Sequence, residues 1–162
     1  MADQHSSSAF TNRVGPPLIG ALLRMPVDAV RQRMLERLHE RGFDDLVSAH
    51  LTVLQYPGPQ DMRPSNLATR LRMSKQALNY LLGELERLGY IERRPDPEDM
   101  RSRRIVLTPR SEAAARVIRE AVSEMEQEWA QQLGQKRFAQ LRTLLLELNQ
   151  LLEPSLGSDL LV

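Results

Sequence analysis

Residues 89–108 (GYIERRPDPEDMRSRRIVLT) concentrate cationic side chains on a stretch short enough to form one hairpin. Five of these residues are arginine, and four acidic residues lie among them. Guanidinium groups held this close together repel one another unless anions compensate them, and a nucleic-acid duplex supplies phosphates at close, regular spacing. We therefore interpret the segment as a candidate phosphate-binding element. Its arginines are Arg93, Arg94, Arg101, Arg103 and Arg104.

The distribution of charge along the chain supports this interpretation. The formal net charge is only +1. Residues 63–110 carry eleven Arg and Lys against six Asp and Glu, whereas the rest of the chain carries eleven against fifteen. A basic middle between acidic ends is typical of a local footprint for a polyanion rather than of a uniformly cationic surface.

Two short helices are predicted immediately before the arginine-rich segment. Ser65 is suited to cap the first and Ser74 the second, which is expected to end at Gly89. The joint Arg72-Met73 is so short that the two helices must cross steeply, which predicts a helix-turn-helix unit. The apolar positions that fit this unit are Leu67, Ala68, Leu71, Met73, Leu78, Leu81, Leu82 and Leu85.

The segment itself is predicted to be a β-hairpin. YIERR (90–94) and IVLT (105–108) are typical of strands, and PDPEDMRS (95–102) is expected to form the loop between them. The helices alone fit ordinary core helices equally well, but a helix-turn-helix followed by a hairpin is a winged helix. The alternative for the hairpin is a solvated loop whose ions pair with one another.

The hairpin tip is expected to contact DNA through Arg101, which can enter a narrow, negatively charged minor groove. Asp99 and Glu98 are expected to orient its guanidinium through bidentate hydrogen bonds. Arg103 and Arg104 complete the DNA-binding residues expected in the hairpin.

The order LATRLRMSKQALNYLLGELERLGYIERRPDPEDMRSRRIVLTP resembles the winged helix-turn-helix core of the MarR family of transcriptional regulators, and the resemblance extends over about residues 18–152. The hairpin is similar to the Asp-Arg-Arg wing motif of that family, followed by Leu-Thr. Met100 stands where the first arginine of the motif is usual, and Ser111 stands where glycine is common. Arg72 stands where older helix-turn-helix proteins favour glycine.

The resemblance implies a homodimer that binds a pseudo-palindromic DNA operator, with the helix at 74–88 in the major groove and the wing beside it. It also implies that a small aromatic ligand can bind and change the spacing of the two reading heads. The sequence identifies no ligand site; His50 and Tyr56 are only loose candidates for its lining.

The exposed face at the start of the second helix supplies side chains that suit base edges. Gln76 and Asn79 suit adenine, and Lys75 suits guanine or phosphate, although each taken singly is equally typical of an ordinary polar surface. Towards the end of the helix the same face becomes acidic. The residues expected to contact DNA in this unit are Ser65, Ser74, Lys75, Gln76, Asn79 and Tyr80.

Long helices are predicted on both sides of the winged helix. The segment 18–41 is amphipathic and ends near Gly42, with a kink or restart expected at Pro26. The segment 111–152 ends in a leucine stripe that we expect to bury against a second copy of the chain; packing within one chain is the alternative. The stripe consists of Leu141, Leu145, Leu148 and Leu152, widened by Leu144 and Leu151.

The sequence thus predicts a mainly α protein with a small β-hairpin wing. A disordered tail is expected at 1–15 and one domain at 16–162, with the winged helix at about 44–110 and dimerisation helices at 18–41 and 111–152. Function as a repressor in the cytoplasm is expected. The alternative is a winged-helix protein-interaction module that does not read DNA sequence.

The sequence contains little that would support other classes of function. Cysteine is absent, which removes disulfides and thiolate chemistry, and three histidines without a ligand motif suggest no metal site. No phosphate loop, zinc-protease motif or nucleophile elbow is present, so neither an enzyme nor a cofactor is expected. No apolar run is long enough to cross a membrane.

Overall fold

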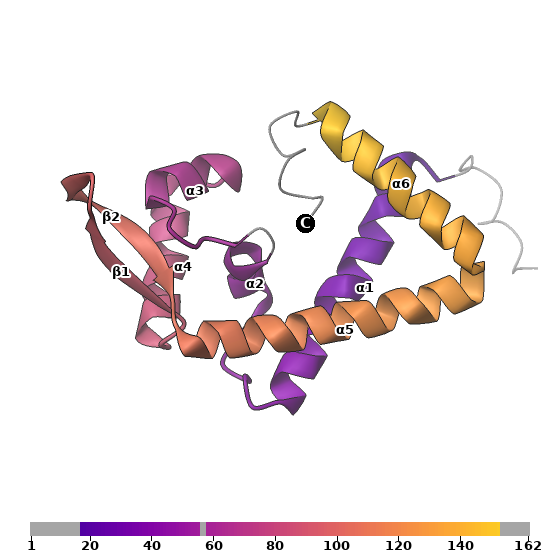
Figure 1. Ribbon diagram of the computed structural model, residues 1–162, viewed down its shortest axis with the longest axis horizontal. Coiled ribbons are helices and arrows are strands. Elements are labelled where there is room, and N and C mark those ends of the chain that lie inside the picture. The colour runs from indigo at the N-terminus through magenta and orange to yellow at the C-terminus, as the bar shows by residue number, and fades with distance from the viewer. Residues whose placement is uncertain (1–16, 56–57, 153–162) are drawn as a thin grey trace, which may run out of the picture.

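The computed structural model describes residues 17–55 and 58–152. Within them the chain forms six helices and one two-stranded antiparallel sheet (Figure 1), which confirms the mainly α architecture with a hairpin wing. The segment 1–15 and Tyr56 lie outside the described residues. The elements are α1 (Ile19–Glu40), α2 (Ser48–Leu54), α3 (Pro64–Arg70), α4 (Lys75–Arg87), β1 (Ile91–Asp96), β2 (Asp99–Leu107), α5 (Pro109–Leu133) and α6 (Gln135–Leu152).

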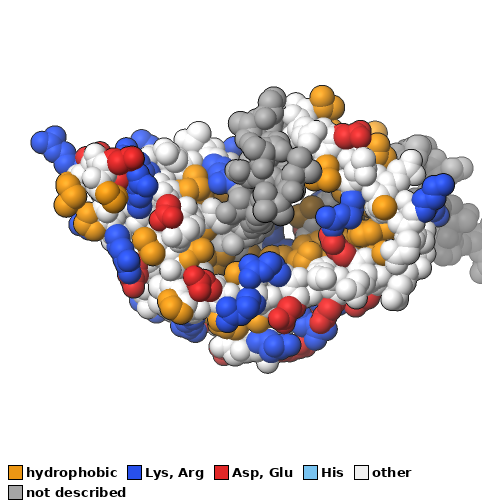
Figure 2. Space-filling view, in the orientation of Figure 1, with side chains coloured by type: hydrophobic (Ala, Val, Ile, Leu, Met, Phe, Trp, Pro, Cys, Tyr) orange, Lys and Arg blue, Asp and Glu red, His pale blue; other side chains and the backbone are white. Residues whose placement is uncertain are grey.

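Helix α5 connects the two ends of the molecule. It starts directly after β2 and leads to α6 at the far end, and α1 crosses it on the way (Figure 1). Ion pairs at successive helical turns hold the crossing, where blue and red side chains alternate in Figure 2. The pairs are Arg33–Glu128 at 3.1 Å, Arg37–Glu124 at 2.9 Å and Arg41–Glu120 at 3.9 Å. This ladder fixes the register of α1 against α5.

Helix α1 runs through Pro26 without interruption, so the restart predicted there is wrong. Proline removes the amide that would bond to the carbonyl of Leu22, but Leu22 is exposed and water can reach that carbonyl. The predicted end near Gly42 is confirmed. Its φ of 82° is a left-handed conformation that glycine adopts without strain.

Helices α3 and α4 form the predicted helix-turn-helix. Ser74 caps α4, because its Oγ accepts a hydrogen bond from the Ala77 amide at 3.1 Å. Ser65 does not cap α3: the helix begins one residue earlier at Pro64, whose fixed φ and missing amide suit a first helical position. Between the helices Arg72 takes a φ of 52°, the position where older units favour glycine. Gly89 ends α4 with a φ of 77°, as predicted.

The hairpin is longer than the sequence suggests, and its predicted loop at 95–102 is wrong. β1 extends to Asp96 and β2 starts at Asp99, which leaves a turn of only Pro97 and Glu98. Pro95 pairs with Arg103 but Asp96 pairs with Asp99, so residues 100–102 bulge out of the ladder. Two carboxylates close this tip by accepting backbone amides two residues ahead, an Asx-type turn that the polar composition conceals.

The base of the hairpin is anchored in the core around Tyr90. This fully buried ring lies beneath the Arg110 guanidinium, 4.5 Å from its centroid, and its hydroxyl donates to Asp45 at 2.6 Å. Burial raises the pKa of Tyr90 above its ordinary value, and the bond to Asp45 acts in the same direction. The core beside it is formed by Leu38, Leu46, Leu51, Leu67, Leu78, Leu82, Leu85, Ile91 and Ile105. None of the helices in the described ranges is long and apolar enough to span a bilayer.

Candidate nucleic-acid interface

The first turns of α4 present a polar face to solvent. Ser74, Lys75, Gln76, Asn79 and Tyr80 are all exposed, while the leucines of the helix point into the core. Tyr80 keeps 66% of its surface exposed, which is unusual for an aromatic side chain without a partner. The structure therefore brings the predicted base-reading residues onto one accessible surface.

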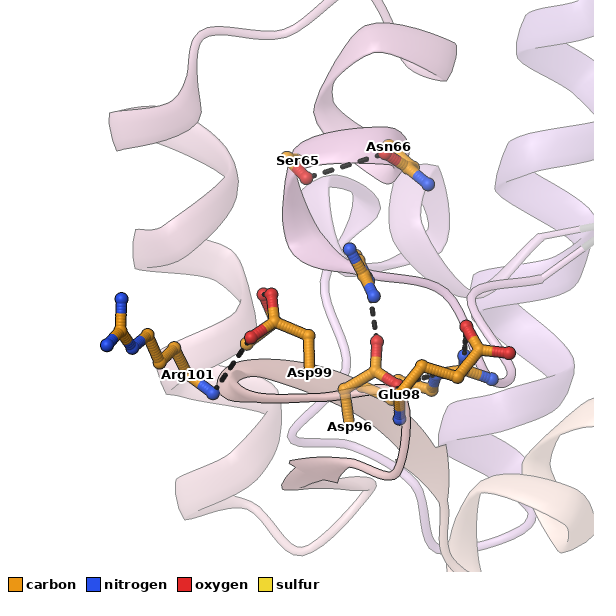
Figure 3. A network of polar contacts seen from close by, with 9 residues as sticks. Ser65, Asn66, Asp96, Glu98, Asp99 and Arg101 are labelled. Carbon is orange, nitrogen blue, oxygen red and sulfur yellow. Dashed lines mark hydrogen bonds and ion pairs between the residues drawn. The ribbon is translucent and has the colours of Figure 1, made fainter.

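The start of α3 borders the same surface. An open groove of about 210 Å³ lies between the two helices, lined by Pro64, Ser65, Lys75 and Asn79. Ser65 thus lies beside Lys75 and Asn79 although it does not cap α3. Its hydroxyl donates to the neighbouring side chain of Asn66, with Oγ 3.4 Å from Oδ1 (Figure 3).

The acidic end of α4 is engaged with other elements. Glu86 accepts hydrogen bonds from both the guanidinium and the backbone of Arg93. Nη2 and Nε of Arg93 lie 2.6 Å and 2.9 Å from Oε2 of Glu86, and the Arg93 amide lies 3.1 Å from Oε1. The hydrogen bond from the Arg93 side chain lowers the pKa of Glu86 against a smaller opposing effect of burial. Arg93 therefore joins the wing base to α4.

The five hairpin arginines divide into engaged and available groups. Besides Arg93, Arg94 pairs with Glu92 at 2.8 Å and Arg104 pairs with two carboxylates. Within the described part of the chain, no hydrogen bond or ion pair occupies the guanidinium of Arg101 or Arg103. Both side chains are exposed. In Figure 2, blue side chains at this end of the molecule lie among red and orange ones.

The predicted support of Arg101 by bidentate carboxylate bonds is wrong. Asp99 accepts the backbone amide of Arg101 at 3.1 Å and the hydroxyl of Ser102 at 2.7 Å, and Glu98 pairs with Arg104 at 2.8 Å. The hydrogen bond from Ser102, followed by that from the Arg101 amide, lowers the pKa of Asp99. Asp99 thus shapes the backbone on which Arg101 stands, and the guanidinium itself points away from the hairpin (Figure 3).

Sequence reasoning missed Asp96 and Arg63. Asp96 is completely buried although it lies at the end of a solvent-exposed hairpin. Its Oδ2 lies 2.5 Å from Nε of Arg63, and its Oδ1 lies 2.9 Å from Nε of Arg104 and 3.0 Å from the amide of Glu98. Burial alone would raise the pKa of Asp96, but the bonds from Glu98, Arg104 and Arg63 outweigh it and lower the pKa to about 2. The sequence did show an acidic residue between the arginines of the hairpin, which is a sign of a possible ion pair. Nothing in the sequence indicates that position 96 pairs with position 63.

Two apolar surfaces remain uncovered at the opposite end of the molecule. On α6, Leu141 is 41%, Leu148 37% and Leu152 68% exposed, while Leu145 is half-buried. The beginning of α1 adds a second exposed stripe. Its members are Leu18, Ile19, Leu22, Leu23, Met25 and Val27.

Known protein families and solved structures show similarity to this chain in sequence and in fold. Residues 48–102, from α2 into the hairpin, match the MarR family. The crystal structure of SP03579, a MarR family transcription regulator, aligns with 83% of this chain and 85% of its own, at 27% identity and a TM-score of 0.62. Tm0710, a transcriptional regulator of Thermotoga maritima, aligns over 84% of this chain and 94% of its own, at 26% identity and a TM-score of 0.57. Over its winged helix-turn-helix, this chain is therefore similar to the MarR family.

A more distant structure supports the winged fold of this chain. The MepR–DNA complex of Staphylococcus aureus aligns with 85% of this chain and all of its own, at 22% identity and a TM-score of 0.64. MepR has also been solved with ethidium bromide. No curated protein sequence matches this chain.

The departures of this chain from the MarR pattern have identifiable places in the structure. Met100 lies in the bulge at the wing tip and is 74% exposed, so no packing explains it. Ser111 lies buried in the first turn of α5, where its amide donates to the Thr108 hydroxyl at 3.3 Å. Thr108 therefore caps α5, and the turn from β2 needs no glycine at position 111.

Proposed function

We propose that this protein is a member of the MarR family and a homodimeric regulator that binds double-stranded DNA at a pseudo-palindromic operator. The observation that carries the proposal is the exposed guanidinium of Arg101 at the tip of a wing that follows a helix-turn-helix with an exposed polar face on α4. A cation that no described residue pairs, held on a braced hairpin, suits a phosphate or a minor groove. The DNA complex of MepR, which shares the fold, supports the same docking.

In the proposed complex, the start of α4 lies in the major groove. Gln76 and Asn79 read base edges there, and Lys75 binds guanine or phosphate. Ser65 approaches the backbone from the groove between α3 and α4. Arg101 and Arg103 extend the contact to the adjacent minor groove, while Arg104 acts indirectly because its guanidinium is held by Asp96 and Glu98.

The second subunit is proposed to cover the apolar surfaces of α1 and α6. Their leucines are exposed in the single chain, which argues against the alternative that they pack within it. A large exposed apolar surface is unfavourable in water and is typical of an interface. Two-fold symmetry then places two α4 helices on two half-sites about one helical turn apart, roughly 34 Å.

We further propose that the protein represses transcription in the cytoplasm by occupying a promoter, and that a small aromatic ligand releases it. The ethidium complex of MepR supports a ligand of this type. Against the expectation that His50 lines such a site, its ring is buried, with Nδ1 3.3 Å from the Val47 amide and Nε2 3.4 Å from Glu84. A ligand that acts in this way must bind the DNA-competent arrangement more weakly than the alternative one.

The proposal is tested by titrating the protein into a random-sequence duplex of about three helical turns at low salt. Binding in units of two chains, with affinity that falls as salt rises, is the expected result. A winged-helix module that only docks proteins would bind no duplex at any salt concentration, and that outcome would refute the proposal.

A further inference from the structure

The wing tip is connected to the helix-turn-helix by one buried carboxylate. Asp96 is the fully buried acidic residue among the residues described, and it lies where the hairpin is otherwise exposed. A buried carboxylate is unfavourable unless it is paired and hydrogen-bonded. Here one partner, Arg104, comes from the opposite strand, and the other, Arg63, comes from the residue that precedes α3.

The segment before α3 also binds the base of the wing. The amide of Asp61 donates to the carbonyl of Ile105 at 2.8 Å, and the amide of Ile105 donates to the carbonyl of Met62 at 2.9 Å. Ile105 pairs with Arg93 across the hairpin. The chain from Asp61 to Arg63 therefore contacts the wing at two levels, its base and its tip.

Contacts at both the base and the tip fix the direction in which the hairpin points. Contacts at the base fix mainly the place from which it starts. Asp96 lies three positions after Arg93 on β1, a length of about 10 Å at the usual strand rise. A tilt of about 10° at the base would move the tip by about 2 Å, which exceeds the tolerance of a hydrogen bond or a groove contact. Contact at the base alone restrains this tilt less than contact at the base and the tip together.

We infer that Asp96 is a positioning residue for DNA binding, which through Arg63 holds the wing at a fixed angle to α3 and α4. The inference rests on the proposed function and deepens it, because Asp96 and Arg63 would determine where the wing meets the duplex relative to the α4 contacts. Asp96 itself touches no DNA, since its carboxylate is enclosed. Its effect on affinity passes through the exposed wing residues, chiefly Arg101.

Two variants and one matched control isolate this role. Asp96→Asn keeps the shape of the side chain but removes its charge. Arg63→Gln breaks only the tie to α3, because the pairing of Asp96 with Arg104 stays within the hairpin, so the hairpin folds even where Asp96→Asn is poorly stable. Glu98→Gln removes a carboxylate from the same hairpin and from the same partner, Arg104, but leaves the Asp96 contacts in place.

The first measurement uses the free protein. Hydrogen exchange at the tip amides, such as those of Glu98 and Arg101, is expected to be about fivefold or more faster in Asp96→Asn and Arg63→Gln than in wild type. Glu98→Gln is expected to exchange like wild type. Unchanged exchange in both variants would overturn the inference, whether or not the protein binds DNA.

The second measurement is a double-mutant cycle on duplex affinity with Arg101→Ala. If Asp96 acts through the wing, the combined loss in Asp96→Asn/Arg101→Ala is smaller than the product of the single losses by about threefold or more. The same is expected for Arg63→Gln/Arg101→Ala. A purely structural role lowers affinity without this coupling, so losses that multiply would overturn the inference. Absence of duplex binding by wild type would instead refute the proposed function.

Discussion

Replacement of Arg101 by alanine separates DNA binding from folding more cleanly than other changes on this surface. No hydrogen bond or ion pair within the described residues holds the guanidinium, and the side chain is exposed at the wing tip. The folded chain therefore loses no internal contact. We expect the free energy of unfolding to change by less than about 0.5 kcal/mol, as is usual for surface substitutions.

The effect on DNA binding follows from counterion release. Each phosphate neutralised contributes about 0.9 to the slope of log affinity against log salt, and a dimer carries two wings, so the slope should fall by about 1.8. The same slope gives an affinity loss of about 60-fold at 0.1 M salt, or about 2.4 kcal/mol. At 0.3 M salt the loss should shrink to about ninefold.

The assay is fluorescence anisotropy with one duplex over a series of salt concentrations. Arg119→Ala is the matched control, because this exposed arginine on α5 removes the same charge far from the wing. We expect the control to keep the wild-type slope. Parallel lines for wild type and Arg101→Ala, separated by a constant factor or not at all, would remove the wing contact from the account.

Three further predictions concern the interface, base reading and pH. Leu148→Glu should convert the dimer into a monomer, because it places a charge in the proposed apolar contact; sedimentation that remains dimeric would contradict this. Gln76→Ala or Asn79→Ala should cost about 1 to 3 kcal/mol on the preferred duplex and relax base preference, whereas an equal loss on every duplex would assign them to the backbone. The depressed pKa of Asp96, about 2 against an ordinary 3.8, means that its stabilising contribution is complete above about pH 4 and disappears as the pH falls through 2. The difference in unfolding free energy between wild type and Asp96→Asn should therefore shrink on acidification in urea denaturation, and a constant difference would contradict the assignment.

Local patterns of sequence were sufficient to predict the two helices that carry part of the site. The apolar spacing in α3 and α4, the Ser74 cap and the glycine at 89 each depend on neighbours a few residues away, and the structure confirms them. Such features are set by propensity and capping within one element. The spacing of leucines likewise predicted the stripe on α6, although its covering by a second chain stays a prediction.

Pairing between distant side chains could not be predicted in this way. The sequence suggested that acids beside Arg101 would hold its guanidinium, but Asp99 binds backbone and hydroxyl, and Asp96 binds Arg63 from another element. The partner that each carboxylate binds depends on which strand bulges and on which helix start lies close to the hairpin tip. The hairpin length was missed for the same reason, because polar residues that close a tight turn look like a long loop when read in order.

The central claim is that two copies of the polar α4 face and the arginine-bearing wing read one symmetric DNA site. Selection of bound duplexes from a random pool tests it most directly, since the selection itself reveals the operator sequence. We predict enrichment of an inverted repeat whose half-sites have centres about 10 base pairs apart. Recovery of sequences without an inverted repeat, or no enrichment over the starting pool, would contradict it.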